Sequence, residues 1–121
     1  MALVVNWPGK PGKTFAFETY PIGTEFKPYS GVYVACKSAN GVNWDALYVG
    51  ETKSFHDRLN TGLEDHDGLK CARRNGVTHI GVLIVNGDAE RLRIETELRH
   101  SLNPPCNRQS ANSAASILSQ R

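Results

Sequence analysis

The amino-acid sequence predicts a small single-domain α/β fold. We expect a central antiparallel sheet of three strands, with a further strand at its N-terminal edge, flanked by helices. Runs rich in β-branched and aromatic residues occupy residues 31–37, 45–50 and 77–85. An Asn-Gly pair, which is typical of tight hairpins, separates the first two runs. Segments with helix start and stop signals follow the second and third runs, so the expected order is β-β-α-α-β-α.

The first 30 residues are expected to form an N-terminal extension that begins rich in proline and glycine. Within it, "TFAFETY" alternates apolar and polar residues, which predicts the edge strand. "PIG" and "KPYSG" then supply turn chemistry. The domain itself is expected over residues 31–108, where "GVYVACK" and "DALYVG" form an antiparallel hairpin around "SANGVNW".

Two short helices are expected after the hairpin. "KSFHDRLNTG" carries Ser54 followed three residues later by Asp57, which is a weak capping-box pattern. "DGLKCARRNG", residues 67–76, ends at Asn75-Gly76, a common helix stop. The first of these helices begins directly after the second strand of the hairpin.

Composition sets limits on the class of protein. The 121 residues fit one domain, followed by a Ser/Ala-rich tail over 109–121. The 14 basic and 12 acidic residues give a net charge of +2, so a polyanion would be bound through a local patch. No apolar run reaches the ~18 residues of a membrane span, and the start lacks the pattern of a signal peptide. We therefore expect a cytoplasmic protein without a membrane-embedded part.

The three cysteines, Cys36, Cys71 and Cys106, are odd in number and contain no C-x-x-C pair. A disulfide framework and a structural zinc site are therefore not expected. We interpret the cysteines as core or incidental thiols in a reducing compartment.

The longest helix is expected over residues 87–102, with Asp88 as its candidate N-cap and "NPPCN" as its stop. Its apolar stripe consists of Leu92, Ile94, Leu98 and Leu102. Helical geometry places Glu95 in the middle of that stripe and Glu97 on the solvent side. An inward carboxylate needs a partner, so Glu95 is either half of a structural ion pair or a group at a functional cleft, as a metal ligand or an acid/base.

Arg58 raises the same question on the first short helix. Phe55 and Leu59 mark the packed face of that helix, and Arg58 lies beside this face. An inward-leaning arginine indicates a carboxylate or a phosphate partner. Glu95 is the candidate carboxylate, and an Arg58–Glu95 pair would be purely structural. A bound phosphodiester is the candidate for the second.

Two tyrosines complete the pattern. Tyr33 and Tyr48 lie centrally in the two hairpin strands; taken singly, each is most often core filler with its hydroxyl at a rim. Together the chain reads "GVY" at 31–33, "YVG" at 48–50, Arg58 ten residues after Tyr48, and Asn107 twelve residues after Glu95. Over about residues 31–108 this combination resembles the GIY-YIG nuclease domain, most of all its compact stand-alone members.

The resemblance implies a metal-dependent endonuclease that hydrolyses phosphodiester bonds in DNA, or in RNA. Tyr33 and Tyr48 match the two motif tyrosines of the family, and Arg58 matches its catalytic arginine. Glu95 matches the glutamate that binds a single Mg²⁺ or Mn²⁺. Asn107 matches the asparagine at the edge of the site, and Gly31 and Gly50 match the motif glycines. Tyr33 or a metal-bound water is the candidate base, and Tyr48 would polarise the phosphate. The alternative is a catalytically weak or inactive module of the same fold that binds nucleic acid or a protein.

Further side chains are candidates for contacting the substrate. They are Lys53, His56, His66, Arg73 and Arg74. For each, an ordinary solvated side chain is the competing interpretation. Glu51 departs from the family pattern, because a carboxylate after "YVG" would repel a phosphate unless a cation screens it. With no room for a separate recognition domain, specificity would come from the first 30 residues, a homodimer or a protein partner.

Overall fold

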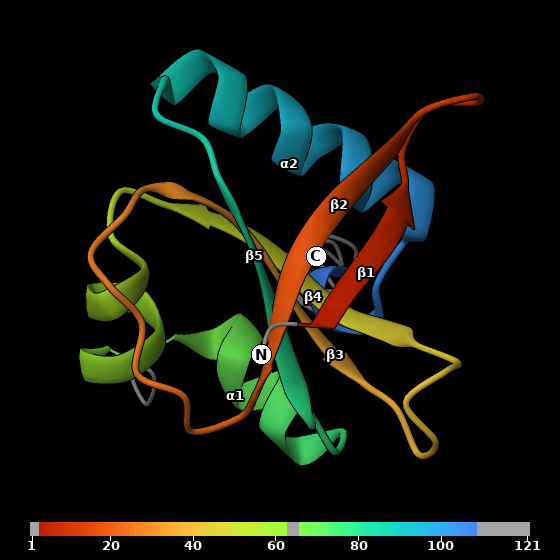
Figure 1. Cartoon of the computed structure of the whole chain (residues 1–121), viewed down its shortest axis with the longest axis vertical. Helices are drawn as coiled ribbons and strands as arrows, with labels where there is room; N and C mark the ends of the chain where they lie inside the picture. The colour runs from red at the N-terminus through yellow and green to blue at the C-terminus, as the bar shows by residue number, and fades with distance from the viewer. Residues whose placement is uncertain (1–2, 63–65, 109–121) are drawn as a thin grey trace, which may run out of the picture.

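The computed structural model describes residues 3–62 and 66–108, which form a small α/β domain (Figure 1). Its elements in chain order are β1 (Leu3–Pro8), β2 (Thr14–Pro21), β3 (Gly31–Lys37), β4 (Asp45–Thr52), a π-helical turn η1 (Asp57–Thr61), α1 (Asp67–Arg74), β5 (His79–Ile84) and α2 (Asp88–Leu102). The expected tail, residues 109–121, lies outside the described residues. No helix in the described part of the chain is long and apolar enough to cross a membrane.

The sheet has five antiparallel strands in the order β1-β2-β5-β3-β4, which corrects the expected count of three plus an edge strand. "TFAFETY" is a strand, but it lies inside the sheet between β1 and β5. The missed strand is β1, in a segment that the sequence indicated as an irregular lead-in. Pro8 is tolerated there because it ends an edge strand, where a missing N–H costs little.

The β3–β4 hairpin is confirmed. Tyr33 lies opposite Gly50 and Ala35 opposite Tyr48, with an irregularity in the pairing between Ala35 and Cys36. Gly41 in the connecting loop has φ 73°, a left-handed conformation that glycine adopts without strain. This register places Tyr33 and Tyr48 on the same face of the sheet, on adjacent strands.

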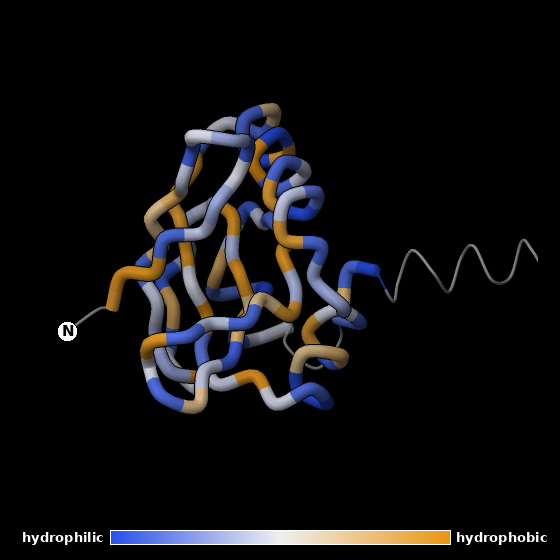
Figure 2. Tube along the Cα trace, turned by 90° about the vertical axis from the view of Figure 1, so that its right-hand side faces the viewer, coloured by the Kyte–Doolittle hydropathy of each residue, from blue (hydrophilic) through white to orange (hydrophobic). Residues whose placement is uncertain are grey.

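Each face of the sheet packs against different elements (Figures 1 and 2). On one face, Val34 and Val49 pack against Ile94 and Leu98 of α2. On the other face, buried residues of β3 and β4 pack against η1 and α1 in a cluster that contains Tyr33. The two tyrosines therefore lie on the face opposite α2.

The buried side of α2 differs from the expected stripe. Arg91, Ile94, Glu97 and Leu98 are buried, whereas Leu92 is 58% exposed. Glu97, expected in solvent, is only 7% exposed, and its Oε2 accepts the backbone N–H of Lys10 at 2.9 Å. The prediction was wrong because β1 and the β1–β2 turn, which cover this side of the helix, were not anticipated.

The helix ends follow the expected chemistry only in part. Ser54 accepts the N–H of Asp57 at 3.2 Å, as the capping pattern predicted. The N-cap of α2 is Gly87 rather than Asp88. Asn103, with φ 47°, ends α2 in a left-handed conformation just before the buried Pro104.

The interpretation of all three cysteines as free thiols was wrong for two of them. Cys71 of α1 and Cys106, which follows α2, form a disulfide. The pairing has no short-range signal, since the two residues are 35 positions apart and meet only through packing. Cys36 is free and buried, and burial raises the pKa of its thiol to about 12, so it is unreactive at neutral pH.

Candidate active site

Tyr33 and Tyr48 form the centre of the site. Their ring centroids are 6.1 Å apart and the planes are inclined by 45°. Tyr33 comes from the buried strand β3 and is fully enclosed, whereas Tyr48 comes from the edge strand β4 and is half-buried. Solvent therefore reaches this pair from the side of Tyr48.

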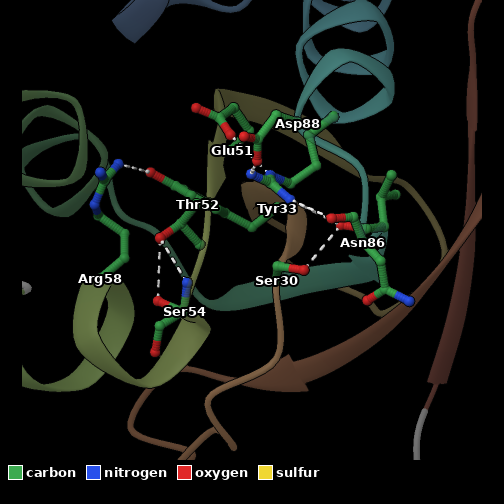
Figure 3. A network of polar contacts seen from close by, with 10 residues as sticks. Ser30, Tyr33, Glu51, Thr52, Ser54, Arg58, Asn86 and Asp88 are labelled. Carbon is green, nitrogen blue, oxygen red and sulfur yellow. Dashed lines mark hydrogen bonds and ion pairs between the residues drawn. The ribbon is translucent and has the colours of Figure 1, made fainter.

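Arg58 reaches the same place from η1. Its Nη1 donates to the hydroxyl of Tyr33 at 3.2 Å (Figure 3). Within the described residues, no carboxylate lies within 4.0 Å of this guanidinium. The alternative in which Arg58 and Glu95 merely pair in the core is therefore wrong, and among the described residues the side chain of Arg58 has one hydrogen-bond partner, Tyr33, for its five N–H groups.

Two glycines provide the space for the tyrosine rings. A Cβ added at Gly50 would lie 2.4 Å from the Tyr33 hydroxyl, and one at Gly68 would lie 2.3 Å from the Tyr48 ring. Gly50, one of the motif glycines, thus leaves the space that the phenol of Tyr33 occupies. Gly68, on the first turn of α1, was missed, because no local pattern shows that this turn packs against Tyr48. Gly31 serves packing, since a Cβ there would meet Leu83 O at 2.0 Å.

Replacing Gly68 by alanine is expected to displace the Tyr48 ring and to destabilise the protein by about 1–3 kcal/mol through overpacking. The ring would have to move because the clash is with its own atoms. Denaturant unfolding measures the loss of stability, and tyrosine ring NMR shifts report the displacement. Gly87→Ala is the matched control, because its nearest atom is 3.9 Å away. Equal stability of the two variants would contradict this packing role.

His66, a candidate from the sequence, does join the site. Its ring lies edge-on to Tyr48 with centroids 5.3 Å apart, and its Nε2 is 3.5 Å from the Tyr48 hydroxyl. Nδ1 accepts the N–H of Leu69 at 3.4 Å, which caps α1. A neutral imidazole that accepts at Nδ1 carries its proton on Nε2. His66 therefore donates to the oxygen of Tyr48 and leaves the Tyr48 hydrogen directed elsewhere.

The stability of the protein should depend on the protonation of His66. Burial, followed by the charge of Arg58, lowers the pKa of His66 below its usual value. The unfolded chain therefore binds this proton more readily, so the free energy of unfolding should fall as the pH drops from 7 toward 5. His66→Asn retains an N-cap but has no ring to protonate. Chemical denaturation across this range should show a shallower decline for the variant, and parallel curves would contradict the assignment.

Glu95 lies close enough to the tyrosines to affect them electrostatically. Burial, and then the charge of Glu95, raises the pKa of Tyr48. The Glu95 side chain is 12% exposed and forms an ion pair with Arg99 at 3.3 Å. Burial raises the pKa of Glu95, Arg99 opposes the increase, and the charge of Glu51 adds to it. Glu95 is thus half-buried beside the buried side of α2 and not in its middle as expected, and its partner is Arg99.

The tyrosines are neutral phenols at physiological pH. Burial raises the pKa of Tyr33 well above its usual value, and the opposing effect of Arg58 is smaller. Burial also raises the pKa of Tyr48, although the charge of Arg58 lowers it in part. Both phenols are therefore protonated in this structure, and the role of Tyr33 or of a metal-bound water as the base stays a prediction.

Asn107 binds the backbone of β4. Its Oδ1 accepts the N–H of Val49 at 2.8 Å, and its Nδ2 donates to Val49 O at 2.9 Å. Both polar atoms of the Asn107 amide therefore bind the backbone of the residue that follows Tyr48. Asn107, expected at the edge of the site, therefore holds the strand that carries Tyr48.

Glu51, whose role the sequence left open, is neutralised on the α2 face (Figure 3). Its Oε1 accepts from Nε of Arg91 at 3.0 Å. Asp88 also binds the Arg91 guanidinium, which donates as well to the carbonyls of Val85 and Asn86. Because alternate strand residues face opposite sides, Glu51 lies away from the tyrosine face.

The other candidates are peripheral. Lys53 is exposed, and His56 lies 3.9 Å from a carboxylate oxygen of Glu25. Arg73 and Arg74 are exposed on the last turn of α1. The structure therefore joins only His66 to the tyrosines from this group of candidates.

A ready-made metal centre is not present, since no three His, Cys, Asp or Glu side chains converge in the described ranges 3–62 and 66–108. The chemistry of Glu95 nevertheless fits a hard divalent cation. Burial and the charge of Glu51 raise the pKa of the Glu95 carboxyl group, and a bound cation would offset both effects. Mg²⁺ typically takes one or two carboxylates and keeps several waters, so Glu95 can suffice as its protein ligand.

The assembled site thus contains two neutral phenols, one neutral imidazole and one guanidinium with no carboxylate partner among the described residues, and the charge of Glu95 on α2 acts on the phenols from nearby. Four elements contribute these groups: β3, β4, the η1 turn and α2, with His66 preceding α1. Comparison of the chain with protein-family models, with curated proteins and with solved structures gives no match.

Proposed function

We propose that this protein is a metal-dependent endonuclease of the GIY-YIG type that hydrolyses phosphodiester bonds in DNA. The observation that carries the proposal is the position of Arg58. Its guanidinium is fixed against the Tyr33 hydroxyl, beside Tyr48, without a neutralising carboxylate among the described residues. A fixed and uncompensated guanidinium next to phenolic donors is suited to hold a phosphate.

Arg58 stabilises the negative charge that develops on the phosphate oxygens during hydrolysis. The contact with Tyr33 uses one N–H of Nη1 and holds the planar group in place. The remaining N–H groups can meet two phosphate oxygens together, which lysine cannot do in this geometry. Arg58 therefore acts as the electrostatic clamp of the site.

Tyr48 donates a hydrogen bond to the substrate. The Nε2–H of His66 donates a hydrogen bond to the Tyr48 oxygen, so the phenolic hydrogen points to another acceptor. A non-bridging phosphate oxygen that also contacts Arg58 is the acceptor that we assign. Because both phenols stay neutral, the proton of the attacking water passes to solvent or to the phosphate itself.

Glu95 would hold the divalent cation, Mg²⁺ or Mn²⁺. When bound, such a cation supplies Lewis-acid stabilisation of the phosphate oxygens and of the leaving group. Arg99 keeps Glu95 ionised in its partly buried position, because its charge opposes the increase in pKa caused by burial.

A cleavage panel tests the proposal. The full chain is incubated with supercoiled plasmid and with duplex, flap, junction, single-stranded and RNA substrates, with Mg²⁺, with Mn²⁺ and with chelator. We expect metal-dependent nicking of DNA that Glu95→Gln reduces at least about a hundredfold. Glu90→Gln is the matched control, since Glu90 lies on the exposed side of the same helix and pairs with Arg93.

Thermal unfolding of both variants accompanies the panel, because a site carboxylate is not optimised for stability and its removal should leave the fold intact. Full nicking by folded Glu95→Gln would contradict the assigned role of Glu95. A folded wild-type protein that binds DNA without cutting it would contradict catalysis and favour the binding-module alternative.

A further inference from the structure

A separate cavity of about 320 Å³ lies on the tyrosine face of the sheet, over β2 and β5. The segment between β2 and β3 forms another wall of this cavity. Its side chains come mostly from residues 18–29, which belong to the N-terminal extension and contribute nothing to the site described above. We name it the aromatic cavity, defined by Glu18, Tyr20, Glu25, Phe26 and Tyr29.

Four aromatic residues line the aromatic cavity: Tyr20, Phe26, Tyr29 and, from the start of the η1 segment, Phe55. Tyr20 and Phe26 meet edge to face, with centroids 5.8 Å apart and planes inclined by 82°. Tyr29 is 52% exposed and leaves much of its ring uncovered. Aromatic faces carry a negative quadrupole, which attracts a cation placed above them.

The walls are fixed without a ligand. The Tyr20 hydroxyl donates to Oε1 of Glu18 at 2.8 Å. Asn60 of η1 accepts the N–H of Phe26 at 2.7 Å, and Phe55 donates its N–H to Tyr29 O at 2.8 Å. A ligand would therefore meet a preorganised pocket, and little ordering would be required for binding.

The charge of the cavity is negative. Glu18 and Glu25 line it together with one lysine, Lys27. The Glu25 side chain is 83% exposed, so it can turn toward a ligand at the mouth. A nucleotide would bring its phosphate toward these two carboxylates, which disfavours it, whereas a cation gains from both.

We propose that the aromatic cavity binds an organic ammonium cation, in which methylated nitrogen packs against Tyr20, Phe26 and Tyr29 while Glu18 and Glu25 supply the counter-charge. A bare metal ion does not fit these walls, because it would lose its waters against apolar rings. A methylated ammonium group is weakly hydrated and combines a positive charge with an apolar surface. This binding is independent of the nuclease activity proposed above.

Titration with choline, followed by backbone amide NMR shifts of the full chain, tests this inference. The control ligand is 3,3-dimethylbutan-1-ol, which has the same shape but no charge. We expect choline to shift the resonances of residues 18–29 and to bind at least about tenfold more tightly than the neutral alcohol. Equal binding of the two ligands would overturn the proposal, as would shifts caused only by adenosine monophosphate.

Variants at exposed positions make the test specific without endangering the fold. Tyr29→Leu keeps an apolar side chain but removes the π face, and it should weaken choline binding about fivefold or more. Tyr29→Phe should retain most of the binding. Glu25→Gln should weaken binding and Lys27→Gln should strengthen it, because these changes alter the local charge in opposite directions. Unchanged affinity in Tyr29→Leu and Glu25→Gln would overturn the assignment.

The cation can be a free small molecule or a side chain of another protein. A short peptide with one trimethyllysine between glycines presents the same group on a polypeptide. Binding of this peptide or of choline supports the proposal, and the tighter of the two identifies the source. Binding of neither probe, with folded protein, would overturn it.

Discussion

Arg58→Ala is expected to reduce metal-dependent nicking by about 10²- to 10³-fold, the loss typical when one preorganised donor to a developing anion is removed. The reason is that Arg58 is the cation held at the tyrosine pair, by its 3.2 Å contact with Tyr33. The loss should appear mainly in kcat, because this charge matters most in the transition state. Single-turnover plasmid nicking at saturating Mg²⁺ measures it.

Arg58→Lys separates charge from geometry. It keeps the positive charge but loses the planar fork, so we expect intermediate activity. Lys13→Ala, which removes an exposed positive charge at the β1–β2 turn, is the matched control for net charge and should cut at the wild-type rate. If Arg58→Ala folds and still nicks plasmid like the control, the site does not perform the proposed chemistry.

Arg91→Ala is expected to produce the largest loss of stability, a decrease in Tm of about 10 °C or more. The Arg91 side chain is 3% exposed and holds Glu51 on β4, Asp88 on its own helix, and two backbone carbonyls between β5 and α2. Its removal leaves the Glu51 carboxylate without a cation and both carbonyls without this donor. Breaking a buried pair from one side is costly for this reason.

Arg93→Ala on the same helix is the matched control. Arg93 is exposed and pairs with Glu90 at 2.8 Å, so its removal should change Tm by only about 2 °C or less. Calorimetry of the two variants and the wild type gives the comparison. Similar Tm values for both variants would mean that Arg91 does not join α2 to β4 as described.

Local patterns predicted much of the fold. The Asn40-Gly41 turn and the β-branched runs on either side of it specified the β3–β4 hairpin, because turn chemistry and strand propensity agree there. The pattern could not reveal that "TFAFETY" lies inside the sheet, since its neighbour β1 ends in a proline and resembles a loop. Strand order depends on long-range pairing, which no local pattern contains.

The candidate site divides in the same way. Tyr48 and Arg58 could be placed together because the helical turn follows β4 directly in the chain. The partner of Glu51 could not be identified from the sequence, because Arg91 lies 40 residues away. The periodicity of apolar residues also does not predict that an arginine is buried. Gly68 was missed because its importance depends on where α1 packs against Tyr48.

The amide of Asn107 has a consequence for how the protein meets its neighbours. Among the strands that the structure describes, β4 is at the edge of the sheet beside β3, and an edge strand offers its free N–H and C=O groups to another chain. Asn107 occupies both groups of Val49, in the middle of that strand. A side chain of the same molecule therefore blocks the position at which a foreign strand would begin to add. The molecule can keep Tyr48 on an accessible strand without that strand becoming a template for aggregation.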